Sequence, residues 1–578
     1  MQPSDLNKLK LLRSNAEMYR NRLYNAEDYQ RYEDLWQGKY NYSGAALPVP
    51  ILVSNAQKQK AAILGPGFQT LITGDTAENY AGARVLTKKL NRMVIDSRMY
   101  YQVDLAVQDT LTLGSGYLLD GFGSRYGTYD ATSREGFDRT RYNKKGKRRI
   151  EYESYVEDNL PWTARVHPAS VLYPPGTVHY SEAFGVFVSY TRHIDDVRAD
   201  EKLSQKHRNR ITPNMKMDYG GSLIDSNLDA AEEYLQLWDF YDLRNSHRVT
   251  FAEDYPNALY DDVDEILIRL DRLPIHPIIF NNNPRYCYGT SDFHLQEAEA
   301  DEVNDIRSMT KILRQRQIPK ILYDLNKLAS RGDTDAKANL EALMSDIMLA
   351  MVGVDGNPNE MIKEFIPHQM PDFGIQLQTA KSEIEQFGSV AMGANQQGTL
   401  SSGRHTKYEA QLAQSHHEGS VMPRKIVVRD ALIDAMYNWA QMIYDFWTEP
   451  QIVQTFDAAG NSVQVEFRGG DLKGDYRFNV NIESMQFKSS EQMLEVNNMI
   501  LAQCQPALMN GVVNPHSLYR QYLSRLNSDW DIESLLMQPM QQQQQMPFDQ
   551  FSQQFTNPPQ GQQQQQQNPL AQFMQGAG

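Results

Sequence analysis

Apolar and polar positions at the start of the chain follow the spacing of helices. From Leu6 to Trp36 the apolar residues recur every three or four positions and so fall on one helical face. Gly38 can end this helix, because glycine is favoured just beyond a helix C-terminus. The same spacing predicts three further helices, at Pro50–Leu64, Ala77–Met99 and Tyr101–Leu113. We therefore expect a helical N-terminal block.

After Gly114-Ser115-Gly116 the pattern changes to short runs in which apolar and polar residues alternate, as is typical of strands. The predicted strands are Gly116–Phe122, Ile150–Val156, Trp162–His167, Phe184–Thr191, Tyr234–Tyr241 and Ile266–Leu270. Four carboxylates directly precede the last of these runs. They suit either a divalent-ion site or a turn before the strand, and we favour the turn: Asp261, Asp262, Asp264 and Glu265.

Helical spacing returns from Ser291 to Gln317, and Pro319 closes this helix. A mixed insert follows, with strand-like Ile318–Tyr323, helical Ala336–Met351 and strand-like Met361–Ile366. Apolar residues then recur at alternating spacings of four and three. This predicts a helix with a narrow apolar seam for side-by-side packing, formed by Phe373, Leu377, Ala380, Ile384, Phe387 and Ala391.

A stretch rich in Gly, Gln and Ser, residues 392–404, separates that helix from a long helical run, His405–Trp447. Gly419 and Pro423 should bend the long helix near its middle. Two strands and two helices are predicted beyond it, at Val463–Phe467, Tyr476–Ile482, Ser490–Gln503 and Pro515–Leu526.

From about Met537 the chain is dominated by Gln, Pro, Met and Gly. Such a segment cannot bury enough apolar surface to order itself, so we expect a disordered tail. The whole chain of 578 residues is long enough for roughly two to four structural units. Its net charge of −15 opposes tight wrapping of DNA, which needs Lys and Arg, but is compatible with DNA passing an acidic wall without sticking.

The two cysteines, Cys287 and Cys504, lie far apart, so neither a disulfide framework nor a thiolate zinc site is expected. The start of the sequence lacks the apolar core of a secretory signal, and no run reaches the ~18 apolar residues of a membrane span. These features predict a reducing, cytosol-like environment.

Motifs for catalysis or cofactor binding are missing from the sequence. Gly38-Lys39 and Gly146-Lys147 lack the following Ser or Thr of a phosphate-binding loop, and no GxSxG or HExxH is present. His416-His417-Glu418 is the most metal-like cluster. Adjacent helical residues point about 100° apart, so a solvated helix face is favoured over a metal site. We therefore expect no enzyme activity, cofactor or metal.

A basic run within residues 134–149 suits nucleic-acid binding, because aromatic side chains such as Tyr142 interleave it. The alternative is a solvent-exposed hairpin loop with Gly136 and Gly146 as turn residues. We favour the loop, and contact with DNA or a capsid partner stays open. The basic residues are Arg139, Arg141, Lys144, Lys145, Lys147, Arg148 and Arg149.

The middle of the chain resembles portal proteins of tailed bacteriophages. The segment 273–283, LPIHPIIFNNN, ends a strand region and leads into a helix containing ADEVNDIRS at 300–308. This resembles the P-x-I-x-F-x-N-N strand and following D-x-x-N-D helix of that family. Residues 165–173 are similar to a portal wing strand and turn. The order of helix, mixed insert, helix, small-residue loop and long kinked helix also resembles the portal order, over roughly residues 10–535.

The resemblance implies an α+β portal-like fold with a helical and β wing, two stem helices and a mixed clip insert. It also implies a long kinked helix and a short helical crown. The Gln-rich tail departs from the family pattern, and a helical barrel is therefore not expected there. The implied parts are wing 1–290, stem helices 291–318 and 372–391, clip 319–371, tunnel loop 392–404, long helix 405–448, return to the wing 449–485, crown 486–535 and disordered tail 536–578.

Three groups of site residues follow from the resemblance. Residues facing DNA at the tunnel loop would be Gln396, Gln397, Ser401, Ser402, Arg404, His405 and Lys407. Stem packing between subunits would involve Phe373, Leu377, Ala380, Ile384 and Phe387. Docking of the packaging motor and the tail adaptor at the clip would involve Lys327, Arg331, Asp333 and Asp335.

The resemblance also implies a function: a ring of about twelve copies at one capsid vertex, through which double-stranded DNA is packaged and ejected. The implied partners are the terminase large subunit, tail adaptors, the major capsid protein and its scaffold, with no membrane. The implied location is the virion, after assembly in the host cytoplasm. The alternatives are another head–tail connector, a metal-dependent nuclease, or a scaffold that binds through the Gln-rich tail.

Overall fold

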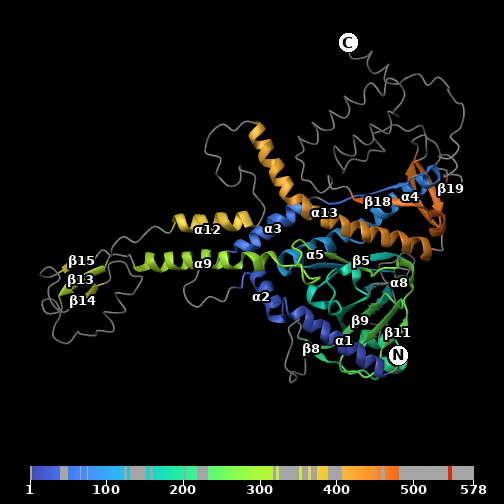
Figure 1. Cartoon of the computed structure of the whole chain (residues 1–578), viewed down its shortest axis with the longest axis horizontal. Coiled ribbons are helices and arrows are strands. Elements are labelled where there is room, and N and C mark those ends of the chain that lie inside the picture. The colour runs from blue at the N-terminus through green and yellow to red at the C-terminus, as the bar shows by residue number, and fades with distance from the viewer. Residues whose placement is uncertain are drawn as a thin grey trace, which may run out of the picture.

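Helices and strands both contribute to the fold, which confirms the mixed α+β class. Figure 1 shows a body of helices and sheets from which two helices project, with a small sheet at their far end. The computed structural model describes residues 3–39, 50–65, 67–74, 76–122, 127–130, 152–155, 160–200, 203–217, 232–316, 320–324, 351–354, 362–365, 374–387, 407–447, 450–456, 462–480, 545–547 and 549.

The N-terminal block is helical, as predicted, but the single helix expected from Leu6 to Trp36 is wrong. Asn25 starts a new helix: its side chain accepts a hydrogen bond from the Asp28 amide at 2.8 Å, and its amide donates to the Asp28 carboxylate at 3.1 Å. This capping box divides the chain into two helices. The helices are α1 (Pro3–Asn21), α2 (Ala26–Trp36), α3 (Ile51–Leu64), α4 (Ala77–Asp96) and α5 (Met99–Leu113).

A six-stranded antiparallel sheet packs against α1, whose Leu6 and Leu9 contact Phe187 and Trp238 in one apolar cluster. Its main path has the order β11-β10-β9-β7-β6, and β8 pairs with β9. The strands are β6 (Val171–Leu172), β7 (Gly185–His193), β8 (Met215–Met217), β9 (Glu232–Asp242), β10 (His247–Phe251) and β11 (Tyr260–Val263). Short helical turns around it are η2 (Pro168–Ser170), η3 (Tyr180–Glu182), α6 (Ile194–Ala199) and α7 (Gln205–Arg208).

The strand predicted at Ile266–Leu270 is wrong, because these residues belong to helix α8 (Glu265–Leu270). Asp264 caps α8, and its carboxylate accepts a hydrogen bond from the Ile266 amide at 2.8 Å. The acidic run therefore ends β11 and begins a helix, and the predicted turn before a strand is also wrong. The capping hydrogen bond favours a helix here, although the apolar run alone is typical of a strand.

A second sheet, of order β12-β2-β5, packs against helix α13 (Lys407–Phe446). Pro423 lies inside α13, and Figure 1 shows that this helix changes direction along its length, as predicted. Trp439, Leu432 and Ala440 of α13 are fully buried in the largest apolar core. The strands are β2 (Gly116–Phe122), β5 (Pro161–Val166) and β12 (Ile275–Ile278), and a separate pair is β3 (Gly127–Asp130) with β4 (Tyr152–Tyr155).

Strands after α13 return to the N-terminal helices. β18 (Tyr476–Val480) pairs with β1 (Thr70–Gly74), and the Asn91 amide of α4 bonds both the N–H and the C=O of Thr70. The other strands are β16 (Gln451–Phe456) and β17 (Ser462–Phe467), followed by η4 (Gly469–Leu472). β19 (Gln545–Pro547) pairs in parallel with β17, so the predicted disorder of the tail is wrong for these residues.

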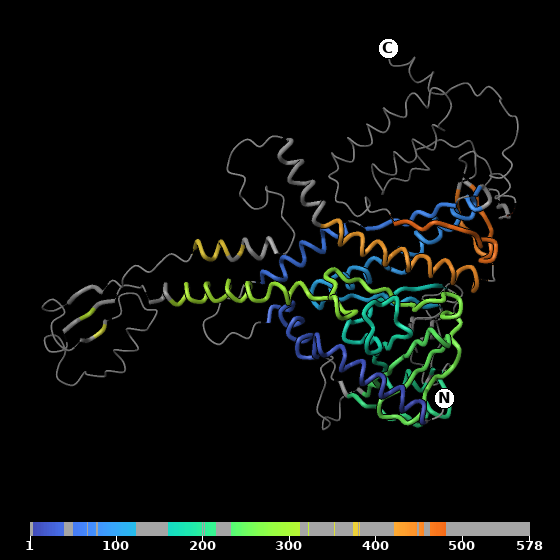
Figure 2. The backbone as a smooth tube through the Cα atoms, in the orientation of Figure 1, coloured from blue at the N-terminus to red at the C-terminus, as the bar shows by residue number. Residues whose placement is uncertain are grey.

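Helices α9 (Asp292–Arg316) and α12 (Gly374–Phe387) lie side by side and project from the body; we call them the arm (Figure 2). The sheet at its far end, of order β14-β13-β15, is called the tip. The first and last of its strands along the chain match the predicted runs Ile318–Tyr323 and Met361–Ile366, whereas the strand that begins at Met351 was not predicted. The rest of the helix predicted at Ala336–Met351 lies outside the described residues. The tip strands are β13 (Lys320–Asp324), β14 (Met351–Val354) and β15 (Ile362–Phe365).

None of the helices in the described residues is long and apolar enough to span a membrane.

Candidate functional site

The arm leaves apolar side chains exposed along its length. On α9, Leu295 is 53% exposed and Met309 is 46% exposed, and on α12 Ile375 is 75% exposed. Asp301 and Glu302, also exposed, lie between the two apolar positions of α9. Isolated exposed apolar residues are ordinary, but a projecting pair of helices with several of them has the character of an interaction surface.

The predicted apolar seam of α12 is described only in part. Leu377 is half-buried and packs against the largest core of its own chain, so its packing between subunits stays a prediction. The remaining seam positions are not described: Phe373 and Ala391 lie outside the described backbone, and Ala380, Ile384 and Phe387 lie within α12 with undescribed side chains.

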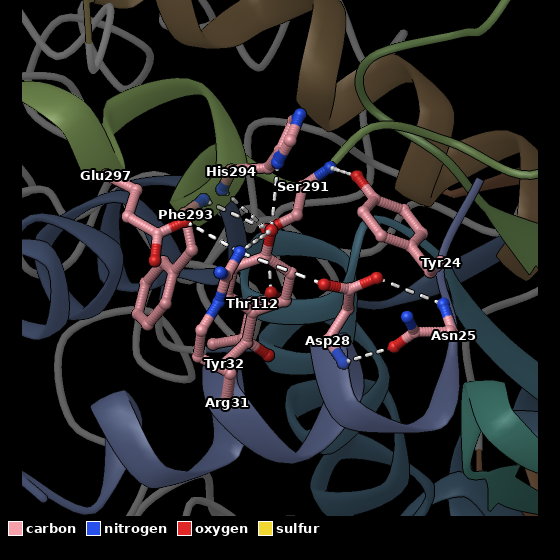
Figure 3. A network of polar contacts seen from close by, with 10 residues as sticks. All are labelled: Tyr24, Asn25, Asp28, Arg31, Tyr32, Thr112, Ser291, Phe293, His294 and Glu297. Atoms are coloured by element: carbon pink, nitrogen blue, oxygen red, sulfur yellow. Dashed lines mark hydrogen bonds and ion pairs between the residues drawn. The ribbon is translucent and has the colours of Figure 1, made fainter. Parts of the chain in front are cut away.

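The base of the arm begins at Ser291, which is fully buried (Figure 3). Its hydroxyl accepts hydrogen bonds from the amides of Phe293 at 3.0 Å and His294 at 3.3 Å, which caps the first turn of α9. The same hydroxyl donates to the Thr112 carbonyl at 2.6 Å, at the end of α5. The Ser291 amide donates to the Tyr24 hydroxyl at 2.7 Å. One short segment thus joins the arm to two parts of the N-terminal block.

Side chains of helix α2 bind the first turns of α9. Arg31 forms an ion pair with Glu297 at 2.9 Å and donates to the Tyr32 hydroxyl at 3.3 Å. The Tyr32 hydroxyl lies 2.9 Å from Nδ1 of His294. Burial raises the pKa of Tyr32, so its hydroxyl stays protonated at neutral pH and can donate to that nitrogen. Burial also raises the pKa of Glu297, although Arg31 opposes the effect.

Arg424 holds the other side of the base. Its guanidinium donates two hydrogen bonds to the Asp292 carboxylate, at 2.7 and 3.2 Å. Asp292 is the first residue of α9 and also accepts from the Asn281 amide at 2.6 Å. Arg424 also bonds the Gln59 side chain of α3 and lies over the Phe280 ring, 5.2 Å from its centroid. Because two hydrogen bonds join the planar guanidinium to the carboxylate, they fix the orientation of Arg424 relative to Asp292 as well as the distance between them.

A separate polar cluster is buried between α13 and the second sheet. The Asp120 carboxylate accepts hydrogen bonds from Thr163 at 2.6 Å and Asn438 at 2.9 Å, and Nε2 of His276 lies 2.5 Å away. The Trp439 indole donates to the Thr163 hydroxyl at 2.9 Å. The buried carboxylate therefore has several hydrogen-bond partners from separate parts of the chain. This cluster fixes the C-terminal half of α13 to the body.

Two features of the described residues bear on bond-making chemistry. Among the described residues no group of three or more His, Cys, Asp or Glu side chains could hold a metal ion. A cavity of about 390 Å³ beside α13 is lined by Cys287 and His276 among others. Burial raises the pKa of the Cys287 thiol to about 12, so this cavity presents no thiolate at neutral pH.

Most of the predicted site residues fall outside the description. The tunnel-loop residues Gln396, Gln397, Ser401, Ser402, Arg404 and His405 lie outside it, and Lys407 is the first residue of α13 with an undescribed side chain. The docking residues Lys327, Arg331, Asp333 and Asp335, the basic run, the crown and Cys504 also lie outside it. His416, His417 and Glu418 lie in α13 with undescribed side chains.

The polar base of the arm was not predicted from sequence. Ser291-Asp292 directly before a helical pattern is a capping signature, so the start of α9 had a readable signal. The partners Tyr24, Tyr32 and Arg424 had none, because they come from distant parts of the chain.

A scan against protein-family models and a search of curated proteins give no match to this chain.

Proposed function

We propose that this chain is a portal-type subunit, which assembles into a ring that conducts double-stranded DNA into and out of a viral capsid. One observation carries the proposal: a two-helix arm bears a small mixed sheet at its far end, and a long proline-containing helix follows along the chain. In this proposal the body is the wing, the arm is the stem and the tip is the clip.

The exposed surface of the arm supports assembly. A closed ring uses head-to-tail contacts, in which two different faces of each subunit meet. The apolar side chains of Leu295, Met309 and Ile375 would be covered by neighbouring arms in such a ring. The overall charge of −15 suits a wall past which DNA slides, because like charge prevents sticking.

The proposal assigns partners by position. The tip would meet the terminase motor during packaging and the tail adaptor afterwards, and the body would contact the major capsid protein and its scaffold. Segment 392–404 would face DNA, with Arg404, His405 and Lys407 near the constriction. The virion would be the final location.

Native mass and negative-stain images of the full chain test the proposal. We expect a closed ring of about twelve copies with an axial hole wide enough for duplex DNA. A monomer or dimer that cleaves DNA only with a divalent ion would instead support the nuclease alternative.

Charge on the arm surface should prevent the ring from forming. The double variant Met309→Asp with Ile375→Asp should stay monomeric, because it places carboxylates where the proposed subunit contact excludes water. Its unfolding free energy should remain within about 0.5 kcal/mol of the parent chain, because both positions are exposed in the single chain. Leu11→Asp, on α1 and 62% exposed, is the matched control and should still form rings. If the double variant still forms rings, the exposed surface of the arm is not the contact between subunits, and this part of the proposal is wrong.

A further inference from the structure

Helix α13 has a built-in weak point directly before Arg424. Pro423 has no N–H group, so it cannot donate to the carbonyl of residue 419 within the helix. Its ring also crowds that carbonyl, and helices bend at such positions. Figure 1 shows the change in direction of α13. The part of α13 before Pro423 is therefore joined to the rest by fewer helical hydrogen bonds.

On the other side of this weak point, Arg424 is held from several directions. It contacts Asp292 of α9, Gln59 of α3 and the Phe280 ring. The Arg424 and Asp292 side chains are 15% and 6% exposed, so their ion pair is largely removed from solvent. Further along α13, the Asn438 and Trp439 bonds described above fix the helix to the second sheet.

We infer that Arg424 is a positioning residue that joins the arm and the C-terminal half of α13 into one rigid unit. Because Val421 is also buried in the largest core, bending of α13 is then confined to the residues before Val421, and the arm keeps its position. The rigidity follows from the contacts alone. Its role rests on the proposed function: the arm and tip would keep their positions in the ring while DNA passes.

The geometry predicts which substitutions matter. Arg424→Lys keeps the charge but loses the two-pronged contact with Asp292, so it should loosen the base of the arm nearly as much as Arg424→Gln. Exchanging the pair, with Arg424→Asp and Asp292→Arg together, restores opposite charges across the contact and should recover part of the rigidity. Arg429→Gln is the matched control, because Arg429 lies in the same helix and pairs with Asp430 at 2.7 Å near the surface.

Hydrogen–deuterium exchange of the full chain tests the inference. In Arg424→Gln and Arg424→Lys, amides of residues 293–300 and 424–430 should exchange about tenfold faster or more, and amides of β7 and β9 should be unchanged. Arg429→Gln should leave the arm at the parent rate. An unchanged rate in residues 293–300, or an equal rise throughout the chain, would overturn the inference. Asp292→Asn gives a second route to the same result if Arg424→Gln does not fold.

The same variants separate this inference from the proposed function. Rings that form and package DNA while exchange in the arm base stays unchanged would refute the positioning role and leave the portal proposal standing. Faster exchange in a chain that never forms rings would support the positioning role and refute the portal proposal. If both hold, Arg424→Lys should form rings and lose at least about half of its DNA retention, whereas Arg429→Gln should retain DNA like the parent chain.

Discussion

The body and the arm use helices in two different ways. The C-terminal half of α13 is buried on several sides, and Leu432, Met436 and Trp439 have no exposed surface. The arm instead exposes apolar residues such as Ile375 along its length. The body therefore contains most of the largest apolar core, which the first turns of α9 share through Phe293, Ala300 and Val303, whereas the outer part of the arm depends on what covers its surface. Stability measured on a single chain should report mainly on the body.

Trp439→Ala should have the largest effect on this comparison. The substitution removes a fully buried indole from the main core and the hydrogen bond to Thr163, and it should lower the unfolding free energy by about 4 kcal/mol. Urea denaturation provides the measurement. Ile375→Ala on the arm is the control and should change the free energy by less than about 0.5 kcal/mol. Similar losses from both variants would show that the arm has a core of its own.

Asp120→Ala should rank second. It leaves His276, Thr163 and Asn438 without their shared acceptor in the interior, which should cost about 3 kcal/mol. Asp430→Ala removes a carboxylate from an exposed ion pair with Arg429 and should cost less than about 0.5 kcal/mol. A loss from Asp120→Ala as small as that from Asp430→Ala would show that the buried cluster does not fix α13 to the body.

The smallest effects concern two glutamates near α2 with opposite pKa shifts. The hydrogen bond to His167 lowers the pKa of Glu33 in the body, whereas burial raises that of Glu297 in the arm. Glu33 thus stabilises the fold above the usual glutamate pKa, and this contribution is lost as pH falls through the lowered value. For Glu297 the contribution is present below the usual pKa and is lost as pH rises through the raised value.

Glu33→Gln should therefore destabilise the chain near pH 7, by less than about 1 kcal/mol because the pair is partly exposed, and have no effect in acid. Glu297→Gln should compare more favourably with the parent chain at neutral pH than in acid. Thermal unfolding from acid to neutral pH measures both differences. Parallel pH profiles for the two variants would contradict this assignment of signs.

Local patterns predicted the elements better than their connections. The helices α3, α4, α5 and α9 and the strands β2, β5, β7 and β9 were predicted from apolar spacing, because each must bury one face. The break at Asn25 and the helix after Asp264 depend on single side-chain caps that override that spacing. For the arm base, sequence indicated only the helix start at Ser291. The contact between Asp292 and Arg424 depends instead on the tertiary structure, because these two residues lie 132 positions apart in the sequence.

The length of α9 has a mechanical consequence. Twenty-five residues of helix extend about 37 Å, at 1.5 Å per residue. A sideways force on the tip therefore acts through a long moment arm, and the resulting torque is balanced within the first turns of α9. Ser291, Asp292 and His294 carry part of this load through hydrogen bonds to α5, α13 and α2. The buried side chains of Phe293 and Val303 carry another part through the largest core. The arm should consequently fail at its root before it fails along its length.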